Sequence, residues 1–258
     1  MRCVTVYCLL PTATKLKLIT FSRSSWRRVH GPRGFLVPLI ELSVRKSGFP
    51  RYSKMLEWLN WNLHLYERNR PYSHVPTFAT KKDLYDHLNA RFDEGRQAMD
   101  YFEFGVFQGE SLRAWCELNR DPKSRIFGFD SFLGLPEDWQ GDFRRGTFTT
   151  GGLPPPVNDP RVNFVIGFFQ QTLPQFLSSY EPRNTLLIHC DSDLYSSTLF
   201  CLATMDHLML AGTLVIFDEF NDASNEYRAL VDYCSAYMRD YRVVAGTRHF
   251  AQAAVEII

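Results

Sequence analysis

The stretch Asp100–Ser111, with the sequence DYFEFGVFQGES, predicts a buried strand that runs into a glycine turn and then into a helix. Gly105 has no Cβ, so the chain can turn sharply where the strand ends, and Gly109 lets the next backbone segment approach a small ligand. Glu103 precedes the turn by two residues and is expected to accept hydrogen bonds from ammonium or hydroxyl groups of that ligand. The stretch therefore predicts a ligand site at the end of a strand in an α/β domain.

The spacing of these glycines differs from that of the dinucleotide-binding fingerprint. That fingerprint, G-x-G-x-x-G, turns backbone N–H groups at a helix N-terminus toward a pyrophosphate. Here the pattern is E-x-G-x-x-x-G-x-S, and the carboxylate of Glu103 would repel a phosphate. We therefore expect a ligand that carries positive charge. A plain strand-to-helix connection remains the alternative, because one glycine turn is weak evidence by itself.

Further apolar strands alternate with helical segments along the rest of the chain. They are expected at 125–130, 162–166, 185–191, 212–217, 241–245 and 252–257. Such alternation is typical of a mostly parallel sheet with helices on both faces. Thr172 is predicted to be the N-cap of the helix that follows the strand at 162–166. The long segment 131–161 is rich in Gly and Pro and is expected to be a lid or binding loop.

Acidic residues stand where several of these strands end. In doubly wound sheets ligands bind outside the carboxyl ends of the strands, so Asp130 is placed to bind ribose hydroxyls. Asp191, Asp218 and Glu219 would converge from neighbouring strands and repel one another unless a cation or a proton joined them. A set of oxygen ligands of this kind suits Mg²⁺.

Charge is distributed unevenly along the 258 residues. Residues 1–50 carry nine Lys and Arg and one acidic residue, a net charge of +8, whereas the remainder carries −7. We expect 1–50 to be a poorly packed basic extension, with an organelle signal as the alternative. The acidic remainder argues against a nucleic-acid enzyme. No apolar run is long enough for a transmembrane helix, and six scattered cysteines indicate reduced thiols in a cytoplasmic protein.

The segment 51–98 is expected to be helical and to precede the ligand-binding domain at 99–258. Large apolar side chains recur at helical spacing through 52–70, and Thr80 followed by Asp83 predicts a capped helix. The aromatic residues of 52–70 predict a contact surface and hence a homo-oligomer.

Taken together, the motifs resemble the macrocin O-methyltransferase family over roughly residues 80–258. The segments that carry the resemblance are EFG at Glu103–Gly105 with Gly109 and Ser111, FGFDSF at Phe127–Phe132 with GLP at Gly134–Pro136, GFF at Gly167–Phe169 with TLP at Thr172–Pro174, HCDSDLYSST at His189–Thr198 and FDEF at Phe217–Phe220. Members of this family are class I methyltransferases that use S-adenosylmethionine.

The resemblance implies a Rossmann-like, seven-stranded sheet and methyl transfer to a hydroxyl, of a sugar, a glycosylated natural product or a polysaccharide, with Mg²⁺. By position, Glu103 and the turn Gly105–Gly109, including Val106 and Phe107, would hold the methionine part of S-adenosylmethionine, and Ser111 its carboxylate. Asp130 would bind the ribose, with Ser131 beside it. Ile166, Gly167 and Phe168 would lie along the adenine. Asp191, Asp218 and Glu219 would be the metal ligands. Asp191 would also contact the cofactor.

The catechol O-methyltransferases, more distant relatives, place a lysine three residues after the first metal ligand, where this chain has Leu194. We therefore expect Asp191 to be the catalytic base as well as a metal ligand, because a bound cation lowers the pKa of the acceptor hydroxyl. His189, on the buried strand before Asp191, is expected to be a core histidine with satisfied hydrogen bonds.

Two other functions remain open at this stage. Asp191-Ser192-Asp193 after an apolar strand looks like the D-x-D motif of a metal-dependent glycosyltransferase, which would bind a nucleotide sugar. A catalytically silent interaction protein that uses 52–70 as its assembly surface is the third class. The glycosyltransferase alternative leaves Glu103, Gly105 and Gly109 unexplained, whereas retained cofactor binding without turnover would favour the interaction protein.

Overall fold

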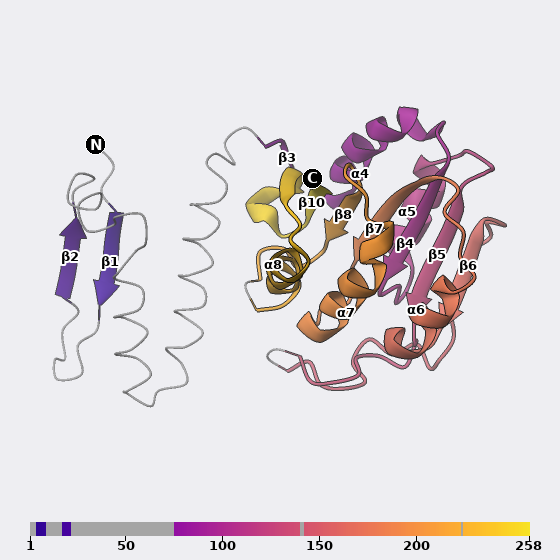
Figure 1. Cartoon of the computed structure of the whole chain (residues 1–258). Helices are drawn as coiled ribbons and strands as arrows, with labels where there is room; N and C mark the ends of the chain where they lie inside the picture. The colour runs from indigo at the N-terminus through magenta and orange to yellow at the C-terminus, as the bar shows by residue number, and fades with distance from the viewer. Residues whose placement is uncertain (1–3, 9–16, 22–74, 140–141, 223) are drawn as a thin grey trace. The chain divides into compact units, whose positions relative to one another are not determined.

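The chain divides into two compact units, Met1–Arg68 and Asn69–Ile258. The structure is a computed structural model that describes residues 4–8, 17–21, 75–139, 142–222 and 224–258 (Figure 1). In the first unit, β1 (Val4–Cys8) and β2 (Lys17–Phe21) pair as an antiparallel ladder. The segment 52–70 lies outside the described residues, as does most of the basic extension, so the expected contact surface remains a prediction.

The second unit contains a sheet and the helices that cover it. Its strands are β3 (Thr77–Phe78), β4 (Met99–Phe104), β5 (Arg125–Asp130), β6 (Val162–Ile166), β7 (Thr185–Cys190), β8 (Leu214–Phe217), β9 (Tyr241–Thr247) and β10 (Ala253–Ile257). Its α-helices are α4 (Lys81–Asn89), α5 (Glu110–Leu118), α6 (Phe169–Leu177), α7 (Tyr195–Met205) and α8 (Glu226–Tyr237). Short 3₁₀ helices follow α4, α7 and β9: η2 (Ala90–Gly95), η3 (Asp206–Leu208) and η4 (Arg248–Phe250).

The sheet has the strand order β3-β9-β10-β8-β7-β4-β5-β6. Strands β4 to β8 are parallel, and β10 is antiparallel to both of its neighbours. The predicted Rossmann-like α/β fold is confirmed. Among the described residues the sheet has eight strands where seven were expected, because Thr77–Phe78 pairs in parallel with the edge of β9. Two residues are too few to show the alternation that identifies a strand in a sequence.

Helices cover both faces of this sheet, as Figure 1 shows. Side chains of β4 alternate between the two layers. Tyr101 contacts Trp115 of α5 with ring centroids 5.6 Å apart, whereas Phe102 contacts Phe176 of α6 on the opposite face at 5.7 Å. Glu103, next in the alternation, therefore lies on the α5 side, and this determines which groups it can contact.

The starts of two helices test the predicted caps. Thr80 is the N-cap of α4, as predicted, and its hydroxyl accepts a hydrogen bond from the backbone N–H of Asp83 at 3.1 Å. The prediction for Thr172 is wrong, because α6 already begins at Phe169, directly after the turn at Gly167. Thr172 lies inside the helix, where its hydroxyl donates to the carbonyl of Phe168. Serine and threonine hydroxyls can bond to the preceding turn in this way, so a TLP sequence does not fix a helix start.

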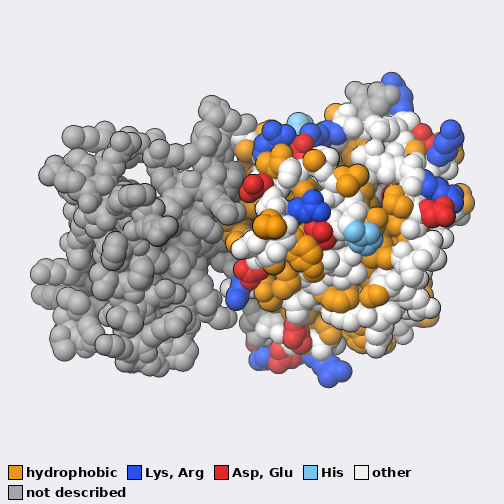
Figure 2. Space-filling model, viewed as in Figure 1, with side chains coloured by type: hydrophobic (Ala, Val, Ile, Leu, Met, Phe, Trp, Pro, Cys, Tyr) orange, Lys and Arg blue, Asp and Glu red, His pale blue; other side chains and the backbone are white. Residues whose placement is uncertain are grey.

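Charged side chains of both signs are interspersed on the face of the described residues that Figure 2 shows. This face of the described residues has no large patch of one sign. None of the described helices is both long enough and apolar enough to span a bilayer.

Candidate active site

A cavity of about 810 Å³ opens at the carboxyl ends of the central parallel strands. Its walls come from the turn after β4, the loop after β5, the turn after β6 and the residues after β7 and β8. All the residues predicted from the sequence to form the site line this cavity except Glu103 and Ile166. The predicted site therefore forms one contiguous surface, built from segments that are far apart in the sequence.

The glycine turn after β4 lies directly against the end of β7. Gly105 has φ +94°, and a Cβ at this position would lie 1.8 Å from the carbonyl oxygen of Asp191. The backbone N–H of Asp191 in turn donates to the carbonyl of Phe104 at 2.9 Å. Gly109 has φ +72° and is the N-cap of α5. Only glycine at position 105 allows the turn and the Asp191 backbone to approach this closely.

Asp130 fixes the conformation of the same turn. One carboxylate oxygen accepts the backbone N–H groups of Val106 and Phe107, each at 2.9 Å, and the other accepts that of Phe132 at 2.7 Å. The sequence predicted a residue that contacts the ribose, and the structure adds a role in which Asp130 joins the ends of β4 and β5. A carboxylate has about four acceptor positions, so these three bonds leave room for a ligand hydroxyl.

Glu103 lies behind the cavity wall. Its carboxylate is completely buried and accepts hydrogen bonds from the hydroxyls of Ser111, at 2.9 Å, and Tyr101. Tyr101 also pairs with Nδ1 of His189 at 2.9 Å. Of these residues only Ser111 lines the cavity. Glu103 thus reaches a ligand through Ser111, whose hydroxyl it orients.

The expected adenine region is formed only in part. Gly167 and Phe168 line the cavity, and so does Ser131 after the neighbouring strand β5. Ile166 is 52% exposed and does not line the cavity. Three aromatic side chains of the long loop, Trp139, Phe143 and Phe148, complete this wall, and Phe148 contacts Phe107 with ring centroids 5.5 Å apart. The loop after β5 is therefore part of the binding surface, as a lid or binding loop would be.

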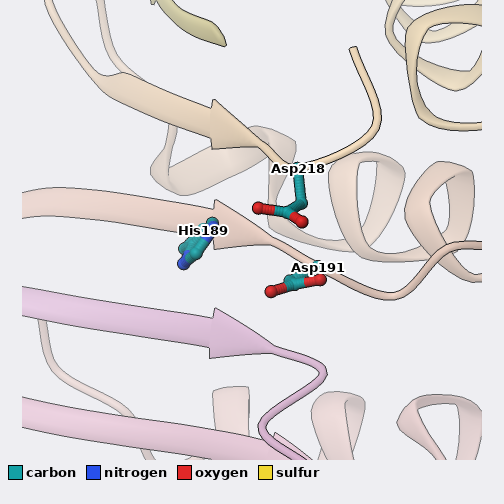
Figure 3. Close-up of side chains that lie close together, drawn as sticks. All are labelled: His189, Asp191 and Asp218. Atoms are coloured by element: carbon teal, nitrogen blue, oxygen red, sulfur yellow. The ribbon is translucent and has the colours of Figure 1, made fainter. Parts of the chain in front are cut away.

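The acidic side of the cavity brings together Asp191, Asp218 and His189 (Figure 3). One potential ligand atom from each of the three lies within 4.8 Å of the others. Glu219 lies outside this group but lines the same cavity. His189 is fully buried, as expected, yet only its Nδ1 has a partner, and Nε2 has none. The cluster is thus a possible metal site whose third donor is an imidazole nitrogen.

The electrostatic environment of these acids favours protons or cations. Burial raises the pKa of Asp191 well above its usual value, and the nearby Asp218 carboxylate raises it further. Burial and the neighbouring carboxylates raise the pKa of Asp193 and of Glu219 to about 7. Carboxylic acids with raised pKa values in a cavity are characteristic of functional sites, because a stronger base can accept a proton from substrate.

Lys81 supplies positive charge to this acidic group. Its ammonium donates a hydrogen bond to Oδ2 of Asp218 at 2.8 Å and lies 2.7 Å from Oδ1. Partial burial alone would lower the pKa of Lys81, but the carboxylates of Asp218, Asp191 and Glu219 outweigh burial and raise it. Lys81 was not among the site residues predicted from the sequence. Its only signal was its position directly after the helix cap Thr80.

A buried carboxylate holds both acidic loops in position. Glu226, in the first turn of α8, accepts the backbone N–H of Ser192 at 3.1 Å and those of Asp218 and Glu219 at 2.9 and 3.0 Å. Glu226 was not predicted from the sequence, because an acid in the first turn of a helix is common for electrostatic reasons alone. Its partners show that it is a positioning residue for the acids after β7 and β8.

Comparison with known proteins identifies the type of domain to which this cavity belongs. Residues 102–220 match a family model described as a methyltransferase domain. The match begins in β4 and ends just after β8, so it spans the strands whose ends form the cavity. Residues 102–220 are therefore similar to a methyltransferase domain.

Solved structures share the fold of the methyltransferase domain at low sequence identity. The O-methyltransferase NovP is 18% identical with a TM-score of 0.52, and the alignment covers 68% of this chain and 78% of NovP. The calicheamicin methyltransferase CalS11 is 20% identical with a TM-score of 0.55, over 92% of this chain and 94% of CalS11. No curated protein sequence matches the chain. The methyltransferase domain also argues against the glycosyltransferase alternative, which rested on Asp191-Ser192-Asp193 alone.

Proposed function

We propose that the protein is an S-adenosylmethionine-dependent O-methyltransferase that acts on a hydroxyl of a sugar, a glycosylated natural product or a polysaccharide. The observation that carries the proposal is the contact between Gly105 and Asp191, which joins a ligand-binding turn to a basic carboxylate in one cavity of a methyltransferase domain. The fold shared with the O-methyltransferase NovP and with the calicheamicin methyltransferase CalS11 supports the class of reaction.

In this proposal residues that follow β4, β5 and β6 and line the cavity would hold the cofactor. The turn Gly105–Gly109 holds the methionine part, and Ser111, oriented by Glu103, binds its carboxylate. Asp130 accepts a ribose hydroxyl with the capacity that its backbone bonds leave free. Gly167 and Phe168 contact the adenine. The acids of the cavity suit the positive charge of a sulfonium donor.

Methyl transfer then requires an acceptor hydroxyl between the donor and Asp191. Bound S-adenosylmethionine would supply an electrophilic methyl group, so that an O–C bond to the acceptor would form as the S–C bond breaks, with S-adenosylhomocysteine as the leaving group. The hydroxyl proton passes to the carboxylate of Asp191, which lines the cavity and accepts the proton in its ionised form. Holding the two reactants in line supplies much of the rate enhancement.

A divalent ion, with Mg²⁺ as the expected one, fits the residues of the acidic side. Asp191 and Asp218 would hold it, with Nε2 of His189 as a third donor and Glu219 nearby on the cavity wall. The buried and unpartnered Nε2 atom is the observation that favours this fit. A bound cation would lower the pKa of the acceptor hydroxyl.

Calorimetric titration with S-adenosylhomocysteine tests the proposal. We expect micromolar binding to the wild-type protein, and thermal unfolding verifies that Asp191→Asn is folded. In a screen of sugar acceptors, Asp191→Asn should lower turnover by about 10²- to 10⁴-fold, the range expected for loss of a general base. Nucleotide-sugar binding without any binding of S-adenosylhomocysteine would overturn the proposal, as would undiminished turnover by Asp191→Asn.

A further inference from the structure

Lys81 connects the start of helix α4 with the acidic residues of the cavity. It is the first residue of α4, whose start is fixed by the Thr80 cap. Its ammonium contacts both carboxylate oxygens of Asp218, at 2.7 and 2.8 Å. The next residue, Lys82, pairs instead with Asp86 on its own helix at 2.9 Å. Only the first of these two adjacent lysines therefore neutralises the acidic side of the cavity.

The position that the ammonium takes is one that a metal ion could also use. Asp218 is one of the three residues whose ligand atoms lie within 4.8 Å of one another, together with Asp191 and His189. An ammonium bound to both oxygens of Asp218 hinders their coordination to a metal. The two cations would therefore compete for the same carboxylate.

Two buried polar atoms beside this carboxylate have no hydrogen-bond partner. They are Nε2 of His189 and the hydroxyl of Tyr85. The rings of these two residues lie edge to face, with centroids 5.9 Å apart. Figure 3 shows one ring nitrogen of His189 turned toward Asp218 and the other turned away. Buried polar atoms in proteins are nearly always partnered, so these atoms indicate a further bound species.

The donor chemistry favours a divalent cation. Carboxylates suit Mg²⁺ and Mn²⁺, and an imidazole nitrogen suits first-row transition metals, so Mn²⁺ is a suitable probe for two carboxylates and one imidazole. The side chain of Lys81 is 46% exposed, so it can turn away from the cavity without leaving water.

We propose that Lys81 is a built-in cation that competes with a divalent metal ion for Asp218, and that the ion binds through Asp191, Asp218 and His189 once Lys81 has moved aside. The acidic site then has two neutralised forms, one with the lysine and one with the metal. The role of the ion in catalysis rests on the proposed function, but the competition itself does not.

Titration of the full chain with Mn²⁺, followed by calorimetry and by the electron paramagnetic resonance of free Mn²⁺, tests the proposal without cofactor or acceptor. Lys81→Met should bind Mn²⁺ at least about tenfold more tightly than the wild type, because the competing charge is gone. Lys82→Met, the matched control on the same helix, should bind like the wild type. Lys81→Arg, which keeps the positive charge, should bind Mn²⁺ as weakly as the wild type does.

A second pair of variants tests the donor set. In the Lys81→Met background, His189→Gln should weaken Mn²⁺ binding and Asp218→Asn should abolish it, with thermal unfolding used to verify that each variant is folded. Equal affinities of the wild type and Lys81→Met would overturn the proposal, as would the absence of Mn²⁺ binding to folded Lys81→Met. If Lys81→Met does not fold, Lys81→Gln replaces it. Failure to bind S-adenosylhomocysteine would count against the proposed function only.

Discussion

Glu226 shows how a single buried side chain determines the geometry of the acidic site. Its carboxylate has no exposed surface and accepts three backbone N–H groups from the segments that carry Asp191, Asp218 and Glu219. An acceptor with two oxygens can hold both loops at once, whereas water or a neutral side chain could not satisfy all three donors. The conformation of the acidic loops thus depends on a residue that does not line the cavity.

Replacing Glu226 by Gln should therefore destabilise the protein and displace the acids. The amide group brings N–H donors toward backbone N–H groups, and a buried donor left without a partner costs about 1–3 kcal/mol. We expect the free energy of unfolding in urea to fall by about that amount and turnover to fall with it. Glu110→Gln is the matched control, since Glu110 is also the first residue of a helix but is exposed. An equal loss of stability in both variants would contradict this role for Glu226.

At the scale of elements, the unit formed by β4, the glycine turn and α5 depends on the close contact between Gly105 and Asp191. Gly105 and Gly212 have nearly the same backbone conformation, with φ of +94° and +93°. A Cβ at Gly212 meets nothing within 4 Å, whereas a Cβ at Gly105 would overlap the Asp191 carbonyl. An alanine at either position therefore introduces the backbone strain of a positive φ, but only an alanine at Gly105 also introduces a clash.

Gly212→Ala should lower the free energy of unfolding by about 1–2 kcal/mol, the cost of a side chain in the left-handed region. Gly105→Ala should lower it further and should also weaken S-adenosylhomocysteine binding, because the turn and the end of β7 must move apart. Chemical denaturation and calorimetry measure the two effects. If both alanine variants bind S-adenosylhomocysteine like the wild type, the turn is not part of the cofactor site.

The elements that the sequence predicted are those whose signal is local. Apolar runs bounded by acids or glycines identified β4 to β8, and the Thr80-x-x-Asp83 spacing identified the start of α4. The two-residue strand β3 and the early start of α6 were missed because they depend on pairing with β9 and on the turn at Gly167. The same distinction holds for the site. Asp191 and Asp218 could be predicted because they follow the ends of strands. Lys81 and Glu226 could not, because Lys81 contacts Asp218, 137 residues later, and Glu226 contacts Ser192, 34 residues earlier.

At the scale of the whole molecule, the acidic cavity determines how stability depends on pH. The pKa of Asp193 and of Glu219 is raised to about 7, and that of Asp191 is raised as well. Between the usual carboxyl range and about pH 7 the folded protein therefore holds protons that the unfolded chain has released. Stability must then fall as pH rises through this window. Asp100, whose bonds to Arg125, Tyr180 and Asn184 outweigh its burial and lower its pKa, loses its contribution only in acid below this window.

The thermal midpoint of the ligand-free protein should accordingly be lower at about pH 7.5 than at about pH 5.5. Asp193→Asn should flatten this dependence, because an amide does not titrate, whereas Asp142→Asn, an exposed loop carboxyl outside the cavity, should leave it unchanged. Saturating Mn²⁺ should raise the midpoint mainly at the higher pH, where the acids are ionised and free to bind a cation. A midpoint that is level or rises between the two pH values would show that other groups govern stability, and that the cavity acids do not hold protons in the folded state.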